Sequence, residues 1–341
     1  MKTQAYYLVR KGLAEHAFEL RDHLLSPLAK NEITIEVEAF GLNYADVMAR
    51  KGMYREAPPL PCVIGYEVVG KIVAIGPSVD PSRLNQRVVA FCRFGGFAKH
   101  VNTPDYAAIP IGDLPAEEAM VLCTQGVTAY YMAMYQAPIR PEDNVLIHAA
   151  AGGVGTVLIQ LARHQGATVI AKVGDPSKMT LTKTLGAHHS ICYTTTDYPS
   201  EVRKILNGNK VDAIFNPVGG STFKQDLALL RPGGRLMLFG GSELGQGKWG
   251  ILSTLNFLRK MGAMLPIGLL MTSRSVLGVN MLKIADHRPD VMSHCLNEVV
   301  KLHAEGIIQP QVGGTFSHEE LAKAHALLES GKTTGKLTVF W

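Results

Sequence analysis

The fold of this chain is decided by the segment Asn144-Val145-Leu146-Ile147-His148-Ala149-Ala150-Ala151-Gly152-Gly153-Val154-Gly155. A short apolar run meets a turn of small residues, and the turn opens an apolar-periodic helix. This order aims unpaired backbone N–H groups and the positive end of the helix dipole at one spot, which favours an anion. The spacing Ala150-x-Gly152-x-x-Gly155 matches the dinucleotide fingerprint with alanine as its first residue. An ordinary glycine-rich turn is the alternative, and the flanking strand and helix favour the dinucleotide interpretation.

From about Pro141 onward, predicted strands and helices alternate. The strands are expected at 144–149, 167–173, 190–193, 211–216 and 234–239, and the helices at 153–165, 177–185, 199–206 and 221–230. Repeated strand–helix units with short connections predict a doubly wound parallel sheet with right-handed crossovers. Ser275–Asn280 could add a last strand to it.

Residues 1–110 are rich in predicted strands, and the pattern over 31–39 alternates apolar with polar residues. A helix at 289–305 and a final strand at 335–341 would return the chain to this first part. We therefore predict an α/β protein in which a β-rich domain, residues 1–125 and 281–341, is split around an inserted doubly wound domain, residues 126–280.

Composition excludes several other classes of protein. The chain has 341 residues, of which 47% are hydrophobic and 18% charged, with a net charge of +5 and no basic run. These values describe a globular protein and argue against nucleic-acid binding. The five cysteines are scattered and no signal peptide opens the chain, which indicates free thiols in a reducing cytoplasm. Arg259-Lys260 and Pro266 interrupt the apolar stretch Gly250–Met271, so we expect a buried or pocket-covering pair of short helices there and no membrane span.

Several further motifs carry a family resemblance. They are Gly41-Leu42-Asn43-Tyr44-Ala45-Asp46, Gly65-Tyr66-Glu67-Val68-Val69-Gly70, Gly126-Val127-Thr128-Ala129-Tyr130, Gly219-Gly220, Arg231-Pro232-Gly233-Gly234 and Gly335-Lys336. With Ala149–Gly155, they resemble the medium-chain dehydrogenase/reductase superfamily and its zinc-free quinone oxidoreductases over essentially the whole chain. Tyr193–Tyr198 and residues 259–282 look most similar to the vesicle amine transport protein branch. The resemblance implies a GroES-like catalytic domain, a Rossmann domain and an active site in the cleft between them.

The resemblance also implies a homodimer, formed through the edge strand near Ser275–Asn280. That segment is rich in apolar residues, and burial in the core would explain this equally well.

The resemblance further implies a site without metal. Zinc-dependent relatives carry a cysteine, a histidine beside a glutamate, and a second cysteine. Here these places read Asn43, Tyr66-Glu67 and about Gln125, so the thiolate and imidazole ligands are missing. Loss of the Lewis acid favours reduction of an already activated acceptor such as a quinone or a conjugated enone. Such an acceptor takes hydride because the resulting negative charge delocalises onto an oxygen.

The segment after the second strand of the predicted sheet bears on the choice of dinucleotide. Asp175 lies about twenty residues after Gly155, where an NAD site places its ribose-binding acid. In Asp175-Pro176-Ser177, however, the aspartate is better interpreted as a helix N-cap followed by proline at the first helical position. Zinc-free relatives place a cationic contact to the 2′-phosphate at Lys178 and an adenosine contact at Tyr193. We therefore predict NADPH, although Lys178 could also be an ordinary solvated lysine.

The remaining site residues follow from the resemblance. The cofactor contacts are expected at Asn43, Thr128, Ala150, Gly152, Gly153, Val154, Gly155, Gly174, Ser177, Lys178, Tyr193, Val218, Phe239, Gly240, Gly241 and Lys336. Thr128 could also be a satisfied helix hydroxyl, and Lys336 a surface lysine.

For the chemistry we favour Asn43, whose amide can donate to the nicotinamide ribose or to a substrate carbonyl. A buried turn-forming asparagine is the alternative. Tyr54 and Tyr66 could orient substrate or lend a proton, or simply form the wall of the pocket. The predicted activity is hydride transfer from NADPH to a quinone or another α,β-unsaturated carbonyl. The alternatives are a 2-enoyl thioester reductase and an NADPH-binding regulatory or structural protein with little turnover.

Overall fold

The computed structural model describes residues 1–245 and 251–341. They divide into two compact units. Unit 1 comprises Met1–Val127, Leu282–His303 and Pro310–Trp341, and unit 2 comprises Thr128–Met281 and Ala304–Gln309. Each unit is described by itself below.

Unit 2 contains a parallel sheet in the order β11-β10-β9-β12-β13-β14. Its strands are β9 (Asn144–Ile147), β10 (Thr168–Val173), β11 (His189–Cys192), β12 (Val211–Asn216), β13 (Leu230–Leu238) and β14 (Ser275–Gly278). The order is that of a doubly wound nucleotide-binding sheet, with its switch point between β9 and β12. The predicted parallel sheet is confirmed, and β14 forms one edge of it.

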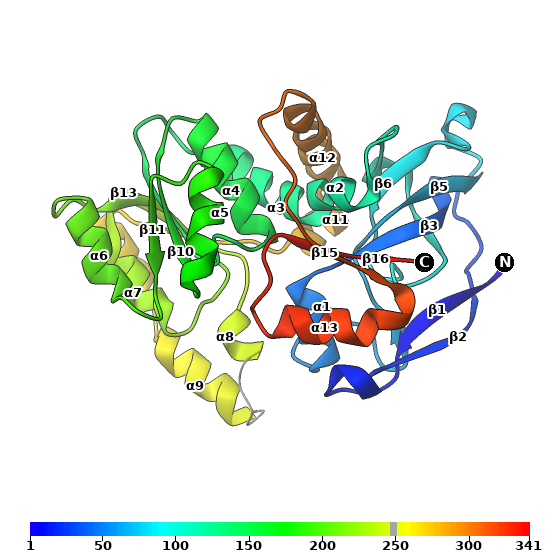
Figure 1. Ribbon diagram of the computed structural model, residues 1–341, viewed down its shortest axis with the longest axis horizontal. Helices are drawn as coiled ribbons and strands as arrows, with labels where there is room; N and C mark the ends of the chain where they lie inside the picture. The colour runs from blue at the N-terminus through cyan, green and yellow to red at the C-terminus, as the bar shows by residue number, and fades with distance from the viewer. Residues whose placement is uncertain (246–250) are drawn as a thin grey trace. The chain divides into compact units, whose positions relative to one another are not determined.

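The helices that connect these strands follow the predicted alternation. They are α4 (Gly153–His164), α5 (Met179–Thr184), α6 (Tyr198–Ile205) and α7 (Thr222–Leu229). In Figure 1, α4 and α5 flank strands β10 and β11 on one side, and α6 and α7 lie on the other. The central strands are largely apolar because helices cover both faces of the sheet, and two buried polar exceptions, Lys172 and Asn216, lie at the carboxyl ends of β10 and β12.

Unit 1 is built on a mixed sheet in the order β15-β16-β3-β5-β6-β8, with β7 also paired to β3; β15 and β16 pair in parallel, and the other neighbours pair antiparallel. Its strands are β3 (Glu32–Leu42), β5 (Glu67–Ile75), β6 (Arg87–Phe91), β7 (His100–Pro104), β8 (Ala108–Pro110), β15 (Val312–Ser317) and β16 (Lys336–Phe340). A smaller sheet pairs β1 (Lys2–Leu8) with β2 (Phe18–Leu24) and β4 (Cys62–Val63). β16 pairs with β3 at Leu337–Leu42, so the end of the chain returns to the first unit, as the sequence predicts.

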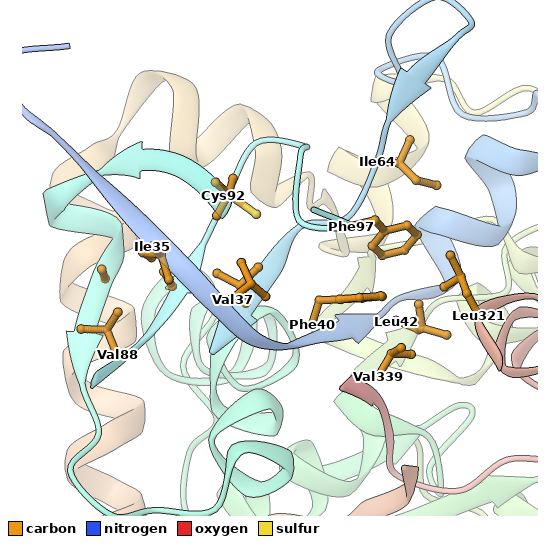
Figure 2. Packing of buried hydrophobic residues seen from close by; sticks show 14 of the residues in the cluster. Ile35, Val37, Phe40, Leu42, Ile64, Val88, Cys92, Phe97, Leu321 and Val339 are labelled. Atoms are coloured by element: carbon orange, nitrogen blue, oxygen red, sulfur yellow. The ribbon is translucent and has the colours of Figure 1, made fainter. Parts of the chain in front are cut away.

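The core of unit 1 gathers along β3. Figure 2 shows Val37, Phe40 and Leu42 of this strand beside Phe97 and Val339. The helices of this unit are α1 (Tyr44–Arg50), α2 (Ala116–Val121), α12 (Pro289–Ala304) and α13 (Leu321–Glu329); α11 (Met281–His287) spans the boundary. After α2, the helical path is broken at Cys123, whose ψ of −110° is not helical, before α3 (Val127–Tyr130).

The segment after β13 contains α8 (Ser242–Gly245), α9 (Ile251–Met261) and α10 (Pro266–Thr272). The predicted pair of short helices is confirmed. Of the two placements expected for it, burial is wrong for α10, which has no buried residue, and covering of a pocket stays a prediction. Leu270 and Met271 are 73% and 80% exposed. Residues 246–250 of the 243–271 segment lie outside the described residues. Among the helices that the structure describes, none combines the length and the hydropathy needed to cross a membrane.

Candidate functional site

The nucleotide turn of unit 2 departs from the predicted strand end. β9 stops at Ile147, because Ala149 adopts a left-handed conformation with φ of 48°. The N–H of Gly152 then donates to the Ala149 carbonyl at 2.9 Å, and Gly152 is the N-cap of α4. Since the first amides of a helix have no acceptor one turn earlier, those of Gly153 and Val154 face outward from the helix start. This is the geometry that an anionic group needs.

Gly155 is required by the packing of α4 against this turn. A Cβ atom at position 155 would lie 2.5 Å from the Ala149 carbonyl oxygen and 2.7 Å from the Ala150 Cα. Gly152 is less constrained, since its Cβ would come no closer than 3.2 Å to any atom. Helix and turn therefore approach more closely at Gly155 than a side chain allows.

At the end of β10, Asp175 acts as a cap. Its Oδ1 accepts the Ser177 N–H at 2.8 Å at the start of the short helix Pro176–Lys178, which confirms the predicted N-cap. Because the Asp175 carboxylate caps this helix, it does not stand at the carboxyl end of β10, where an NAD site places its ribose-binding acid. Burial lowers the pKa of Lys178, and Asp175 partly offsets that effect.

Tyr193 borders the same strand end. Its hydroxyl lies so close to Gly174 that a Cβ there would sit 2.9 Å from it, and the side chain is 52% exposed. Gly174, Tyr193, Ser177 and Lys178 thus lie around the carboxyl end of β10, which is where a doubly wound sheet holds the adenosine half of a dinucleotide.

Two loops at the carboxyl ends of β12 and β13 are fixed to each other. Asn216 Oδ1 accepts the N–H groups of Val218 at 2.7 Å and Gly219 at 3.0 Å. The Phe239 N–H donates to the Asn216 carbonyl at 3.2 Å, and a Cβ on Gly240 would lie 2.7 Å from the Pro217 oxygen. The predicted residues Val218, Phe239, Gly240 and Gly241 therefore belong to one rigid edge of the sheet. Thr128 is buried on α3, at the start of unit 2.

In unit 1, Asn43 belongs to a buried ion-pair cluster. Its Nδ2 donates to Glu67 Oε1 at 2.7 Å, and its Oδ1 accepts from Lys336 Nζ at 3.1 Å. Lys336 also forms an ion pair with Glu67 and donates to the Leu42 carbonyl at 3.1 Å. The second Glu67 oxygen accepts the Thr124 N–H at 2.7 Å. Lys336 and Glu67 are both 0% exposed, so their charges compensate each other inside the unit.

Two neighbours shape this cluster. Gly41 leaves room for it, because a Cβ there would lie 2.6 Å from both Glu67 Oε1 and Lys336 Cε. Asp46 accepts the Asn43 backbone N–H at 2.8 Å, and burial raises its pKa to about 8. The backbone of Asn43 and its amide are therefore both held, which leaves its carboxamide in a single orientation.

Tyr54 and Tyr66 meet edge to face in unit 1, with ring centroids 6.2 Å apart. The Tyr66 hydroxyl is buried and has no hydrogen-bond partner among residues 1–245 and 251–341. Burial raises the pKa of Tyr54 to about 12 and raises the pKa of Tyr66 further. Both phenols are therefore neutral near pH 7 and would act as weak hydrogen-bond donors.

Asn43, Tyr54, Tyr66 and Lys336 thus belong to unit 1, where Asn43 contacts Lys336 and Tyr54 contacts Tyr66, and the remaining predicted residues belong to unit 2. Sequence reasoning missed the part that Glu67 plays. The available signal was a glutamate at the start of an apolar strand, because a carboxylate buried there requires a cation nearby. In the part of the chain that the structure describes, no three His, Cys, Asp or Glu side chains are placed to hold a metal ion.

Comparison with known proteins now bears on the family. The model of the alcohol dehydrogenase GroES-like domain matches residues 29–136, and that of the zinc-binding dehydrogenase matches residues 153–301. The synaptic vesicle membrane protein VAT-1 homolog of Rattus norvegicus is 31% identical over 308 residues, which cover 90% of this chain and 76% of the relative. The chain belongs to the medium-chain dehydrogenase/reductase superfamily, quinone oxidoreductase type.

Other members of the superfamily have named activities. Quinone oxidoreductase 1 of Escherichia coli (strain K12) and 2-haloacrylate reductase of a Burkholderia species are each 30% identical to this chain, with 90% of both chains covered. Among solved structures, mycobacterial Rv1454c complexed with NADPH has a TM-score of 0.86 at 28% identity, covering 99% of this chain and 100% of that one. Escherichia coli quinone oxidoreductase complexed with NADPH has a TM-score of 0.85 at 26% identity, with the same coverage. These likenesses confirm the predicted fold class, a GroES-like unit with a Rossmann-type parallel sheet.

Proposed function

We propose that this protein is an NADPH-dependent oxidoreductase that transfers hydride to a quinone or another α,β-unsaturated carbonyl without a metal. The observation that carries the proposal is the buried Asn43–Glu67–Lys336 cluster. Two relatives bear the names quinone oxidoreductase and 2-haloacrylate reductase, and both named acceptors are activated double bonds.

Unit 2 fits a phosphorylated dinucleotide. The start of α4 offers its amides to a pyrophosphate, and Gly152 leaves the backbone accessible. Among the described residues, none supplies a carboxylate at the end of β10, because Asp175 turns away to cap the next helix. Lys178 is the cation we assign to the 2′-phosphate. Bound NADPH supplies the hydride.

Unit 1 provides a donor for the negative charge that develops on the acceptor oxygen. A carboxamide has two N–H groups, and one of those on Asn43 is used by Glu67. We assign the other to the substrate oxygen or to the cofactor ribose. Lys336 holds the Asn43 oxygen and thereby fixes which way the amide faces, so we assign it to orienting Asn43 rather than to touching the cofactor. A hydrogen-bond donor that is already held in position stabilises the transition state more than a mobile donor does, because the donor does not have to reorient during the reaction.

The same cluster argues against a metal requirement. Glu67 already accepts from Lys336, Asn43 and the Thr124 N–H, so its oxygens are committed. Asn43 and Tyr66 present an amide and a neutral phenol, which are poor zinc ligands.

The test is steady-state oxidation of NADPH by the metal-stripped protein with a panel of quinones and conjugated enones. We expect turnover that chelators do not reduce, and a loss of at least tenfold in kcat for Asn43→Ala. Retained NADPH affinity in this variant would assign the second Asn43 N–H to the substrate oxygen, and weakened NADPH affinity would assign it to the cofactor ribose. NADPH binding without turnover of any acceptor would leave only a binding protein. Activity that depends on added zinc would refute the metal-free part of the proposal.

A second acceptor class has support of its own. The chain is 25% identical to the CurK enoyl reductase structure, with a TM-score of 0.84 and 99% of this chain covered. We therefore include a 2-enoyl thioester in the panel beside the matching simple enone. A kcat/KM at least a hundredfold higher for the thioester would favour the enoyl reductase alternative.

We further propose that the protein acts as a homodimer in the cytoplasm. Within residues 1–245 and 251–341, β14 pairs only with β13 and forms an edge of the sheet, which supports pairing with a second copy. Sedimentation equilibrium of the wild type and of a Val276→Pro variant tests this. The wild type should be dimeric and the variant monomeric.

A further inference from the structure

Unit 2 contains a buried charged cluster that the proposed function does not use. We call it the Lys172 cluster, and it consists of His148, Lys172, Tyr198, Asn216 and Asp226. The two charged members, Lys172 and Asp226, are 4% and 0% exposed. Asp226 accepts from His148 Nε2 at 3.0 Å, from the Tyr198 hydroxyl at 2.9 Å and from Asn216 Nδ2 at 2.5 Å.

The hydrogen bonds fix the protonation of the cluster. Lys172 Nζ lies 3.2 Å from His148 Nδ1, and an ammonium can only donate, so that nitrogen carries the lone pair. The His148 proton is therefore on Nε2, facing Asp226. Burial lowers the pKa of His148, which agrees with a neutral ring. The cluster thus holds one positive and one negative charge, separated by a neutral imidazole.

Lys172 contacts Tyr193, which lies at the carboxyl end of β10, the end predicted to hold the adenosine half of the cofactor. Its ammonium lies 4.8 Å from the centre of the Tyr193 ring and 3.9 Å from that of Tyr198. The Lys172 carbonyl also accepts the Ala150 N–H of the nucleotide turn at 3.1 Å. Lys172 stands two residues before Gly174, at the carboxyl end of β10 that a dinucleotide's adenosine half would face.

We propose that Lys172 is a positioning and specificity residue for the 2′-phosphorylated adenosine group, which makes the preference for NADPH over NADH dependent on pH. This inference rests on the proposed function. The ammonium holds the Tyr193 ring by a cation–π contact and adds positive potential beneath the strand end. Charged Lys172 favours the binding of a phosphate dianion at this strand end, whereas the binding of an unphosphorylated ribose depends little on that charge.

The direction of the pH effect follows from burial. Burial lowers the pKa of Lys172 to about 8, and Asp226 partly offsets this. The titratable groups that face its ammonium are His148 on the turn after β9, Tyr193 after β11, Tyr198 on α6 and, through His148, Asp226 on α7. A bound phosphate raises the pKa of Lys172. The preference for NADPH over NADH therefore declines as the pH rises from about 8 to the higher pKa that Lys172 has in the NADPH complex.

The experiment measures dissociation constants of the full chain for NADPH and NADH between pH 7 and pH 9.5. Over this range the 2′-phosphate, whose pKa is about 6, stays a dianion. For the wild type, we expect the ratio of NADPH to NADH affinity to fall roughly tenfold. Lys172→Met should lower the ratio roughly tenfold at pH 7 and make its decline with pH clearly smaller than the wild-type decline; the part that remains belongs to Lys178, whose pKa burial also lowers. Lys172→Arg, which stays charged, should keep a high ratio at pH 9.5.

Lys178→Met is the matched control. It removes the half-buried cation assigned to the same phosphate, and it should lower the ratio while keeping most of the decline with pH. A purely structural role of Lys172 would weaken NADPH and NADH equally and leave their ratio unchanged.

Two outcomes overturn the inference while leaving the proposed function intact. One is a wild-type ratio that does not change with pH, and the other is a Lys172→Met ratio that still declines as the wild-type ratio does. If neither dinucleotide binds the wild type, the proposed function itself fails. If Lys172→Met does not fold, Lys172→Gln and the wild-type pH profile decide the question.

Discussion

Lowering the pH should weaken unit 1 through one buried histidine. His325 lies on α13, is 0% exposed, and packs against Phe18 and Phe97 with ring centroids 4.7 and 5.7 Å away. Neither ring nitrogen has a hydrogen-bond partner within the described ranges. Burial, with a smaller contribution from Arg50, lowers the pKa of His325 from 6.5 to about 3.

The size of the effect follows from that shift. The folded pKa lies below the unfolded one, so the stabilisation is present above pH 6.5 and is lost as the pH falls toward 3. Below pH 6.5 the unfolded chain gains a proton that the folded chain cannot accept. Each pH unit below 6.5 removes about 1.4 kcal/mol, so the free energy of unfolding should be about 2 kcal/mol lower at pH 5 from this residue alone.

The assay is urea unfolding at pH 7.5 and pH 5.0 in a Trp249→Phe background. Trp341 is then the single tryptophan, and it packs against the core of unit 1. The difference between the two pH values should be about 2 kcal/mol smaller in His325→Leu than in the parent. All other groups titrate alike in both proteins and cancel. His16→Gln, at an exposed site, should leave the difference unchanged. Equal pH dependence of His325→Leu and its parent would refute the reasoning.

Three further changes have expected outcomes. Lys336→Met should destabilise unit 1 by about 3–5 kcal/mol in urea unfolding, because Glu67 stays buried without its cation. Adding Glu67→Gln should recover much of that loss, whereas additive losses from the two substitutions would contradict the ion pair. Gly155→Ala should cost about 1–3 kcal/mol and weaken NADPH, whereas Gly152→Ala should unfold nearly as the wild type does; equal effects would contradict the close packing. Ala149→Gly should raise or preserve the Tm, since glycine relieves the left-handed strain; a drop of several degrees would argue against it.

The parts of the site that depend on neighbours in sequence were predictable. The strand, turn and helix around Gly152 follow from apolar periodicity and small residues within a dozen positions. The Asp175 cap depends on an amide two residues away, so the local pattern Asp-Pro-Ser sufficed. The left-handed Ala149 was not predictable, because alanine gives no sign of a positive φ.

What the sequence by itself determined is therefore the order of strands and helices, the nucleotide turn and the cap beyond it, since these are set by residues close along the chain. Only the tertiary structure decided which buried charges meet. Lys336 reaches Glu67 because β16 and β5 pair with opposite sides of β3. Lys172 reaches Asp226 through His148 because β9 and β10 pair in register and Asp226 of α7 contacts His148 just after β9. A buried charge demands a partner, but strand register and helix packing select which one, and no pattern in the sequence reports either.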